Sequence, residues 1–422
     1  MRRIKYAWLA PQRPAAAPTA PLPSFDVHDL TKNIALSAED HAYCVALGQE
    51  LQSLYDGAPA YIKQHDLDLE IFLPGNEWAG IVPTSGLRFR TDYNWINYLR
   101  LHAPFAGFHM PILDRLDGGA KFPREGAVEF VTKLSSEGIP DDIAEQQQTR
   151  FPAAERLRHT IPEYLDHIRN VPSQYVVRTP RMFGEIGLEI DGVLVNPDVT
   201  LCQSRINALY CSGILEKLAS DIERRGHARI IEIGAGHGGL AYALQQIFDN
   251  RVEYIVVDLP SSLFYAAIYL SVLGGREGSH LLAADETPPD HFTHLFVANH
   301  LFERALPHLG HVDLAINCMS FPEMSEGQIR YYGHAIKRLI GDDGVLFEEN
   351  AALAPHHTDC KAIFAKIFPY HLHIASQMVT TKNWCQDLWA ARYIGKIFDR
   401  RDVAALQPQK REAFRNRGTD FL

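Results

Sequence analysis

A glycine-rich segment near the middle of the chain has the residue types of a nucleotide-binding turn. Residues 231–239 read Ile-Glu-Ile-Gly-Ala-Gly-His-Gly-Gly, and Asp258 ends the next apolar run. Gly234 and Gly236 permit a tight turn in which a ligand lies against bare backbone. A helix that starts there presents free N–H groups to an anion. Asp258 then has the position of an acid that accepts both hydroxyl groups of a ribose.

The glycine spacing alone leaves two classes of cofactor open. Gly234, Gly236 and Gly239 also satisfy the G-x-G-x-x-G spacing of NAD-binding folds. Glu232 adds an acid two residues before the first glycine, and E-x-G-x-G-x-G is the methyltransferase form of the motif. The sequence therefore favours S-adenosyl-L-methionine. A dehydrogenase stays as one alternative, and a sheet in which Gly238 and Gly239 only allow close packing is the other.

Three titratable residues are candidates for removing a proton from an alcohol acceptor, a step that needs a positioned general base. Glu323 is our first choice, and the alternative for it is an acid facing the dipole of the helix that follows. His237 lies inside the glycine turn, where a packing role is the alternative, and His300 follows a predicted strand. Methyl transfer is an in-line displacement, so alignment and exclusion of water can supply most of the rate.

Strands and helices alternate around these residues, which predicts a Rossmann-like α/β fold with a parallel sheet covered on both faces. The predicted strands are Arg229–Ile233, Tyr254–Val257, His294–Ala298, Leu314–Asn317 and Val345–Glu348. The predicted helices are Gly238–Phe248, Ser261–Leu273, Glu326–Ile340 and about Asp359–Ile367. Tyr370–Val379 and Asp387–Ile394 follow as two strands, and their short connection predicts an antiparallel hairpin.

The chain before the glycine turn reads differently. Residues 1–24 are a Pro/Ala-rich tail, 25–175 a mainly helical domain, 176–400 the cofactor-binding domain and 401–422 a C-terminal tail. Helices are predicted from Ser37 to about Tyr55 and over Asn94–Leu101, Gly126–Ser135, Ile143–Gln148 and Pro152–Arg169. A hairpin over Phe183–Asp198 turns at Asp191-Gly192, and a helix over Thr200–Arg225 ends at Gly226.

Composition excludes several classes of partner. The formal net charge is −10, which argues against a nucleic-acid partner because phosphate binding requires clustered Lys and Arg. Six widely spaced cysteines indicate reduced thiols in a cytoplasmic protein. The longest uncharged run, Leu259–Gly275, contains Pro260 and two glycines, so we expect no membrane span. The expected partner is a small-molecule or glycan acceptor.

From residue 181 to 350 the sequence resembles the bacterial sugar O-methyltransferases, a group of class I S-adenosylmethionine-dependent methyltransferases. The similar stretches are F-G-E-I-G at 183–187, Q-S-R-I-N-A-L-Y at 203–210, E-I-G-A-G-H-G-G-L at 232–240, V-D-L-P at 257–260, S-F-P-E-M at 320–324 and E-E-N at 348–350. The D-L-P and S-F-x-E-M motifs are more specific than the glycine turn, which all class I methyltransferases share. Residues 1–170 carry no such match.

The resemblance implies where each part of the ligands would lie. It places the methionine part of the cofactor on residues 234–238, and the ribose on Asp258. The end of the third strand would lie near the adenine or the acceptor, and residues 317–324 would face the methyl group. The implied cofactor contacts are Glu232, Gly234, Ala235, Gly236, Gly238, Asp258, Leu259, Asn299 and Asn317. The implied acceptor contacts are Arg181, Glu185, Ser320 and Asn350.

These observations predict an O-methyltransferase that acts on a hydroxyl of a sugar or a glycosylated metabolite. A non-sugar natural product as acceptor, an NAD-binding oxidoreductase and a non-catalytic cofactor-binding protein are the alternatives. The cluster of His356, His357, Asp359 and Cys360 has metal-ligand types, but it precedes a helix where His and Asp are ordinary caps. We therefore predict no metal. The helical N-terminal half closes over the acceptor or forms the face of a homodimer.

Overall fold

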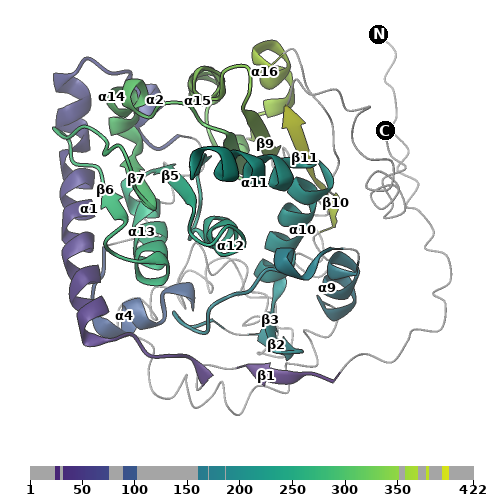
Figure 1. Cartoon of the computed structure of the whole chain (residues 1–422). Coiled ribbons are helices and arrows are strands. Elements are labelled where there is room, and N and C mark those ends of the chain that lie inside the picture. Colours follow the sequence, from purple (N-terminus) through teal and green to yellow (C-terminus); the bar gives the residue numbers. More distant parts are fainter. Residues whose placement is uncertain are drawn as a thin grey trace, which may run out of the picture.

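The computed structural model describes residues 24–28, 32–75, 89–101, 160–169, 171–185, 187–350, 357–368, 377–379 and 392–398. The predicted helices at 126–135 and 143–148 and the predicted tails lie outside these residues. Within them an eight-stranded sheet has the order β10-β11-β9-β8-β4-β5-β7-β6 (Figure 1). The strands are β4 Ala228–Ile233, β5 Val252–Asp258, β6 Ser279–Leu281, β7 His294–Ala298, β8 Leu314–Cys318, β9 Val345–Glu349, β10 Gln377–Val379 and β11 Arg392–Phe398.

The strand directions define the fold. Strands β4 to β9 pair only in parallel with one another, whereas β11 pairs antiparallel with both β9 and β10. The chain starts in the centre at β4, moves outward through β5 to the edge strand β6, and comes back to β7 between them. It then crosses to β8 on the other side of β4. The order with its reversed strand is that of the class I methyltransferase sheet, and it confirms the predicted fold class. It also places a topological switch point between β4 and β8.

Two details of the sheet differ from the prediction. β6 was not expected, because its three residues Ser-His-Leu carry no apolar run and are only half-buried. β11 continues to Phe398 rather than ending at Ile394, and it lies between β9 and β10. The antiparallel pairing of the two terminal strands is confirmed. The remainder of the two predicted runs lies outside the described residues.

The strands are buried on both faces, as expected for a parallel sheet between helices. β5 is buried from Val252 to Val257, and β7, β8 and β9 along their whole length. The helices packed around the sheet are α11 Ile214–Arg225, α12 Gly239–Ile247, α13 Pro260–Gly274, α15 Glu326–Ile340 and α16 Cys360–Ile367. Short turns of helix connect them: η6 Asn299–Leu301, α14 Phe302–Ala305, η7 Leu306–His308 and η8 Phe321–Glu323.

α13 is buried on nearly all sides because a helix from the N-terminal half covers it. α1, Ala38–Gln64, extends nine residues beyond the predicted end and packs along α13 (Figure 1). Gly48 allows this approach, since a Cβ there would lie 3.1 Å from a ring carbon of Phe264. The apolar run at 259–275 is thus an internal helix. No helix among the described residues is long and apolar enough to span a membrane.

A second, three-stranded sheet precedes the large one. It consists of β1 Asp26–His28, β2 Gly187–Ile190 and β3 Val193–Val195, all antiparallel in the order β1-β2-β3. The predicted hairpin of β2 and β3 is confirmed. Asp191 and Gly192 both have positive φ, +50° and +77°, which is the backbone of a two-residue type I′ turn. β1 was not predicted.

The helices near this hairpin correct two predictions. The expected helix Thr200–Arg225 is two helices, α10 Pro197–Cys211 and α11, because Gly213 between them takes a left-handed conformation with φ +74°. The expected helix Asn94–Leu101 is α4, Tyr93–Asn97, followed by the 3-10 turn η2, Leu99–Leu101. The other described elements are α2 Leu69–Phe72, α9 Thr160–Ile168 and η5 Ser173–Tyr175.

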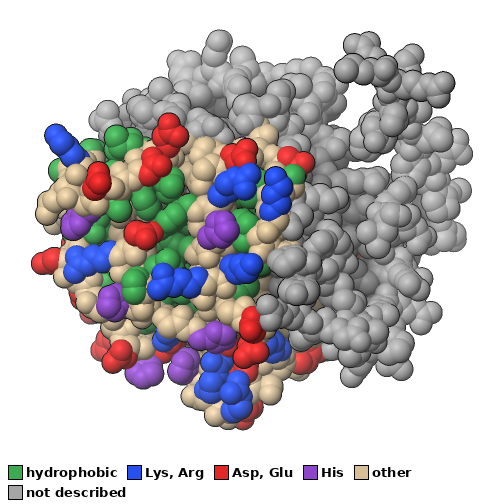
Figure 2. All heavy atoms as spheres, turned by 90° about the horizontal axis from the view of Figure 1, so that it is seen from above, with side chains coloured by type: hydrophobic (Ala, Val, Ile, Leu, Met, Phe, Trp, Pro, Cys, Tyr) green, Lys and Arg blue, Asp and Glu red, His purple; other side chains and the backbone are tan. Residues whose placement is uncertain are grey.

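Seen from above, the described surface shows acidic, basic and histidine side chains interspersed around a hydrophobic area (Figure 2). No field of one sign of charge covers the described part of this face. Nucleic-acid binding usually relies on clustered Lys and Arg, so this face does not have that character. Among the described residues, Cys44, Cys202, Cys318 and Cys360 are buried and form no disulfide.

Candidate functional site

A cavity of about 490 Å³ lies over the carboxyl ends of the central strands, at the switch point of the sheet. Its floor is formed by the glycine turn after β4, by Asp258 at the end of β5 with Leu259 after it, and by Ser320 after β8. Asn299, which follows β7, completes this side. A volume of this size fits a small-molecule ligand. The position is where open α/β sheets bind their ligands.

The glycine turn is held in place from below by the end of β8. Gly234 has φ +73°, and a Cβ there would lie 2.3 Å from the hydroxyl of Ser320. That hydroxyl donates to the carbonyl of Ile233 at 3.1 Å, and the Asn317 amide donates to the same carbonyl at 2.7 Å. Asn317 therefore shapes the turn and does not line the cavity. Glycine at position 234 is required for both backbone conformation and space.

Two carboxyl groups with raised pKa values stand at the floor. Asp258 is half-buried, and its Oδ1 accepts from the backbone N–H of Leu259 at 2.8 Å. Burial raises the pKa of Asp258 to about 7, and the carboxylates of Glu232 and Glu323 add to the rise. Glu232 is buried in β4 and accepts from the hydroxyl of Tyr254 at 2.7 Å. Burial raises its pKa to about 7 as well. A ligand that donates hydrogen bonds or carries positive charge would stabilise both carboxylates.

The opposite wall is an ion-pair network built around Arg100 of η2. This side chain is buried, and its Nε donates to Oε2 of Glu185 at 3.0 Å. Its Nη2 contacts the carboxylate of Asp198. The other oxygen of Glu185 accepts from the amide of Asn196 at 2.7 Å, and Asn196 also caps α10. The network thus joins the N-terminal half, the hairpin segment and α10 at the cavity.

His237 turns back from the glycine turn toward this wall. Its Nε2 lies 3.9 Å from Oδ2 of Asp198, and its ring meets the ring of Tyr269 edge to face at 5.2 Å between centroids. The ring lies directly over Gly239, where a Cβ would be 2.5 Å from Nε2. Glycine at 239 therefore makes room for the imidazole inside the cavity. His237 and Asp198 together could accept and stabilise a proton.

Glu323 lines the cavity from η8, on the side of Asp258. Its backbone N–H donates to the carbonyl of Ser320 at 3.2 Å, which fixes the short 3-10 turn that carries it. The predicted base Glu323 and the predicted base His237 thus occupy different parts of one cavity. Both are placed where they can contact a ligand.

The cavity is closed on one side by the segment after α2. Pro74 and Gly75 line it, and two side chains from the sheet domain hold this segment in place. Asn299 Nδ2 donates to the carbonyl of Phe72 at 2.7 Å. Gln328 Nε2, from α15, donates to the carbonyls of Ile71 at 3.1 Å and Leu73 at 3.0 Å. The amide nitrogen of Asn299, predicted as a cofactor contact, is therefore bound to backbone.

Several predicted site residues do not line the cavity. His300 is buried against Tyr61 of α1, with 5.5 Å between ring centroids, and burial lowers its pKa to about 4. Arg181 pairs with Glu189 of β2 at 2.9 Å, outside the cavity. Asn350, which follows β9, donates from its amide to the carboxylate of Glu348 at 2.8 Å and does not line the cavity. Gly238 lies behind the turn, where a Cβ would be 2.9 Å from Leu270 of α13, so its role is close packing.

The remaining predicted residues do meet there. Those that line the cavity are Glu232, Gly234, Ala235, Gly236, His237, Asp258, Leu259, Asn299, Ser320, Glu323 and Glu185. Sequence reasoning missed a second set on the wall, which comprises Arg100, Arg178, Asp198, Arg205, Tyr242 and Tyr269. Arg205 stands in the Q-S-R-I-N-A-L-Y stretch at 203–210, and Asp198 stands in the first turn of a helix that follows a hairpin. These positions carried the usable signals, and no local motif marks the other four residues.

The cavity contains more acids than bases among the described residues. Carboxylates outnumber guanidinium groups five to three: Glu185, Asp198, Glu232, Asp258 and Glu323 against Arg100, Arg178 and Arg205. Two of these arginines are already paired, Arg100 as described and Arg205 with Oε1 of Glu349 at 2.8 Å. Such a cavity favours a ligand with positive charge over a polyanion.

No protein-family model and no curated protein matches this chain. Among solved structures it is similar to the O-methyltransferase TomG from Streptomyces achromogenes, involved in tomaymycin synthesis and in complex with SAM, at 15% identity and TM-score 0.29, over 45% of this chain and 87% of that one. It is similar to the mitomycin 7-O-methyltransferase MmcR at 12% identity and TM-score 0.29, over 48% and 57%. It is similar to an O-methyltransferase family protein from Burkholderia thailandensis at 11% identity and TM-score 0.30, over 48% and 60%.

Proposed function

We propose that this chain is an S-adenosylmethionine-dependent O-methyltransferase. The observation that carries the proposal is the floor of the cavity, where the glycine turn after β4 and the carboxyl of Asp258 after β5 lie side by side. This arrangement can bind a ligand whose carboxylate contacts the glycine turn and whose ribose contacts Asp258. The strand order of the sheet agrees with it.

The charge of the cavity favours S-adenosylmethionine over NAD. S-adenosylmethionine carries a sulfonium and an ammonium group, whereas NAD carries a pyrophosphate. Arg100 is paired with Glu185 and Asp198, and Arg205 is paired with Glu349. The excess of acid at the cavity therefore rests on Glu232, Asp258 and Glu323 against Arg178. A pyrophosphate would meet this excess of negative charge, while a sulfonium would be stabilised by it.

In the proposed reaction the cofactor supplies a methyl group on a positively charged sulfur. The residues of the chain align the acceptor hydroxyl with that group, exclude water and take the hydroxyl proton as the new C–O bond forms. Glu323 is the first candidate for this base. His237 is the second, because Asp198 stands beside it and could orient the imidazole and stabilise its protonated form.

For the acceptor we propose a hydroxyl of a sugar or glycosylated metabolite. The wall that faces the glycine turn offers carboxylates and guanidinium groups in Glu185, Asp198 and Arg178, which suit a ligand rich in hydroxyls. Tyr242 and Tyr269 add aromatic surface. A hydroxylated natural product that is not a sugar is the alternative acceptor. The homodimer and the cytoplasmic location stay predictions.

Calorimetry tests the cofactor. We expect the purified chain to bind S-adenosylmethionine and S-adenosylhomocysteine, and to give no comparable signal with NAD. Tight binding of NAD without a response to S-adenosylhomocysteine would contradict the proposal.

Mass spectrometry of molecules that co-purify with the chain tests the acceptor class, and a hexose-containing ligand is the expected result. Cofactor binding without methyl transfer to any sugar or natural-product pool would favour a non-catalytic protein.

A further inference from the structure

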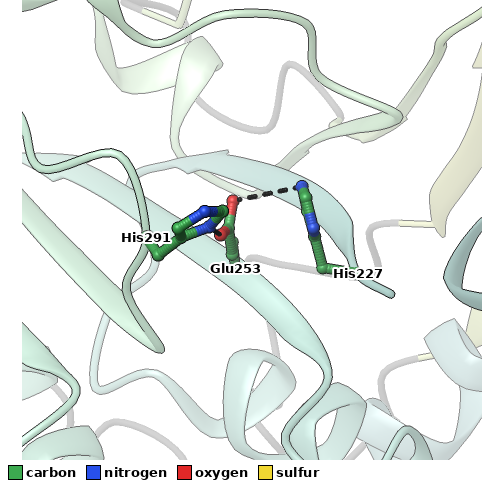
Figure 3. A group of neighbouring side chains, drawn as sticks. All are labelled: His227, Glu253 and His291. Carbon is green, nitrogen blue, oxygen red and sulfur yellow. Dashed lines mark hydrogen bonds and ion pairs between the residues drawn. The ribbon is translucent and has the colours of Figure 1, made fainter. Parts of the chain in front are cut away.

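Two histidines and a glutamate meet at the amino-terminal edge of the sheet, the edge opposite to the cavity (Figure 3). His227 immediately precedes β4, Glu253 is the second residue of β5, and His291 lies in the connection that leads to β7. One side-chain ligand atom from each residue lies within 4.8 Å of those of the other two. Three segments that are distant in sequence thus bring metal-ligating groups to one point.

The contacts within the cluster show how the three groups face one another. His291 Nδ1 lies 2.9 Å from Oε1 of Glu253, and His227 Nε2 lies 3.6 Å from Oε2 (Figure 3). The two imidazole rings stand edge to face, 5.8 Å between centroids. The Glu253 side chain is only 7% exposed, whereas that of His291 is 79% exposed. The carboxylate therefore forms a floor, and the histidines form an open entrance for an ion.

Arg229 fixes the carboxylate from the other side. Its Nε donates to Oε2 of Glu253 at 2.8 Å, and its Nη1 donates to the carbonyl of Leu309 at 2.5 Å. The guanidinium also lies over the ring of Phe292, 5.4 Å from its centroid. Arg229 thus occupies Oε2 and leaves Oε1 directed at His291. Metal-binding carboxylates are commonly held by such a hydrogen bond to the oxygen that does not bind the ion.

We propose that His227, Glu253 and His291 bind one divalent transition-metal ion, with Zn²⁺ as the best fit. Two imidazole nitrogens and one carboxylate oxygen, completed by water, are a ligand set that Zn²⁺ accepts in tetrahedral geometry. Mg²⁺ and Ca²⁺ prefer oxygen ligands and fit this set less well. On binding, the ion replaces the hydrogen bond between His291 and Glu253.

The position of the cluster indicates a structural role. The ion would tie the connection before β7 to the first residues of β4 and β5, far from the carboxyl ends where the cavity lies. An ion that binds only the folded chain raises the free energy of unfolding by RT ln(1 + c/Kd), where c is the free ion concentration, so the rise grows with the logarithm of c once the site is filled. The proposal does not depend on the methyltransferase function, and turnover is not its readout.

The test is a titration of the chelator-treated full-length chain with Zn²⁺, followed by calorimetry and by thermal unfolding. We expect the unchanged chain to bind one equivalent of Zn²⁺ and to melt at a higher temperature with it. In His291→Ala and His227→Ala, Zn²⁺ binding should be lost or its affinity should fall about tenfold or more, and the rise in melting temperature should disappear. His280→Ala is the matched control, because His280 also pairs with a single carboxylate, Glu286, at 3.0 Å. It should behave like the unchanged chain.

Co²⁺ gives an independent readout of the ligands, because its visible absorption reports nitrogen and oxygen coordination. We expect a band in the unchanged chain and in His280→Ala that is missing in His291→Ala. His291 is largely exposed, so this variant should keep the fold, which circular dichroism checks. Equal Zn²⁺ stoichiometry, equal thermal shift and an unchanged Co²⁺ band in all variants would overturn the proposal.

Discussion

Nε2 of His237 lies 3.9 Å from Oδ2 of Asp198, and the imidazole reaches this position by lying over the Cα of Gly239. Asp198 is held in turn by the buried guanidinium of Arg100. The glycine turn therefore serves two purposes. Gly234 makes room for the Ser320 hydroxyl beneath the turn, and Gly239 makes room for a titratable ring inside the cavity.

The first prediction follows from this packing. Gly239→Ala should push the His237 ring away from Asp198, because the new Cβ would lie 2.5 Å from Nε2. If the ring takes part in the reaction, we expect turnover to fall by about 10²-fold, the cost of a small misplacement of a catalytic group. Steady-state kinetics checks this. Gly327→Ala in α15 is the control, since its Cβ meets only the Ser325 hydroxyl at 3.7 Å. Equal kinetics in the two variants would leave His237 as a packing residue.

The second prediction identifies the base. Glu323→Gln keeps the shape of the side chain and removes its ability to take a proton. We expect turnover to fall by about 10²- to 10⁴-fold with cofactor affinity nearly unchanged. The paired variant is His237→Asn, measured with the same acceptor. If Glu323→Gln turns over like the unchanged chain and His237→Asn does not, the base is His237 and Asp198 is the residue that positions it.

The third prediction concerns the ribose contact. Asp258→Ala should weaken binding of S-adenosylhomocysteine by about 1–3 kcal/mol, the scale for loss of a buried acceptor from a polar ligand. Calorimetry measures the difference directly. Asp249→Ala, on the exposed turn after α12, is a control that should leave the affinity unchanged. An affinity that does not change in Asp258→Ala would move the ribose contact to another residue.

Much of the sheet and of the cavity floor could be predicted from the sequence, because both depend on local patterns. The five predicted parallel strands are mostly apolar runs, and the glycines and Asp258 stand at fixed offsets from two of them. The wall could not be predicted in this way. Arg100, Glu185 and Asp198 come from three separate segments, and only tertiary packing brings their charges together.

His300 shows a second limit of local reasoning. Asn299 and His300 both follow β7, so strand position alone places both near the cavity. Both residues lie in the 3-10 turn η6, where successive side chains point about 120° apart. Asn299 lines the cavity, whereas His300 packs on Tyr61 of α1. No motif in residues 1–170 predicts that α1 contacts the sheet domain.

The fourth prediction tests the ion-pair network as a structural element. Arg100→Met removes the charge but keeps much of the volume, and it leaves the buried carboxylate of Glu185 without its cation. Loss of one partner of a buried ion pair costs about 3–5 kcal/mol, so chemical denaturation should show that the free energy of unfolding falls by this amount. The control is Arg251→Met. Arg251 pairs with Glu223 at 3.0 Å on the surface, so its loss should cost less than about 1 kcal/mol.

The fifth prediction is a pH dependence of cofactor binding. Burial raises the pKa of Asp258 to about 7, and the pKa of Glu232 to about 7 as well. Because these values exceed those of the unfolded chain, the folded state without ligand binds more protons between about pH 4 and 7, and its stability falls as the pH rises through that range. A cationic ligand that contacts the carboxylates has the opposite preference, so its affinity should rise from pH 6 to 8.

Calorimetry with S-adenosylmethionine, which carries the sulfonium, measures this trend at several pH values. Below pH 7 we expect the affinity to change by up to about tenfold per pH unit if one carboxyl must lose its proton, and to level off above it. Asp258→Asn cannot titrate, so only the part of the slope that belongs to Glu232 should persist in this variant. A slope that is unchanged in Asp258→Asn would assign the whole titration to Glu232, and a flat profile in the parent chain would mean that neither carboxyl contacts the ligand in its ionised form.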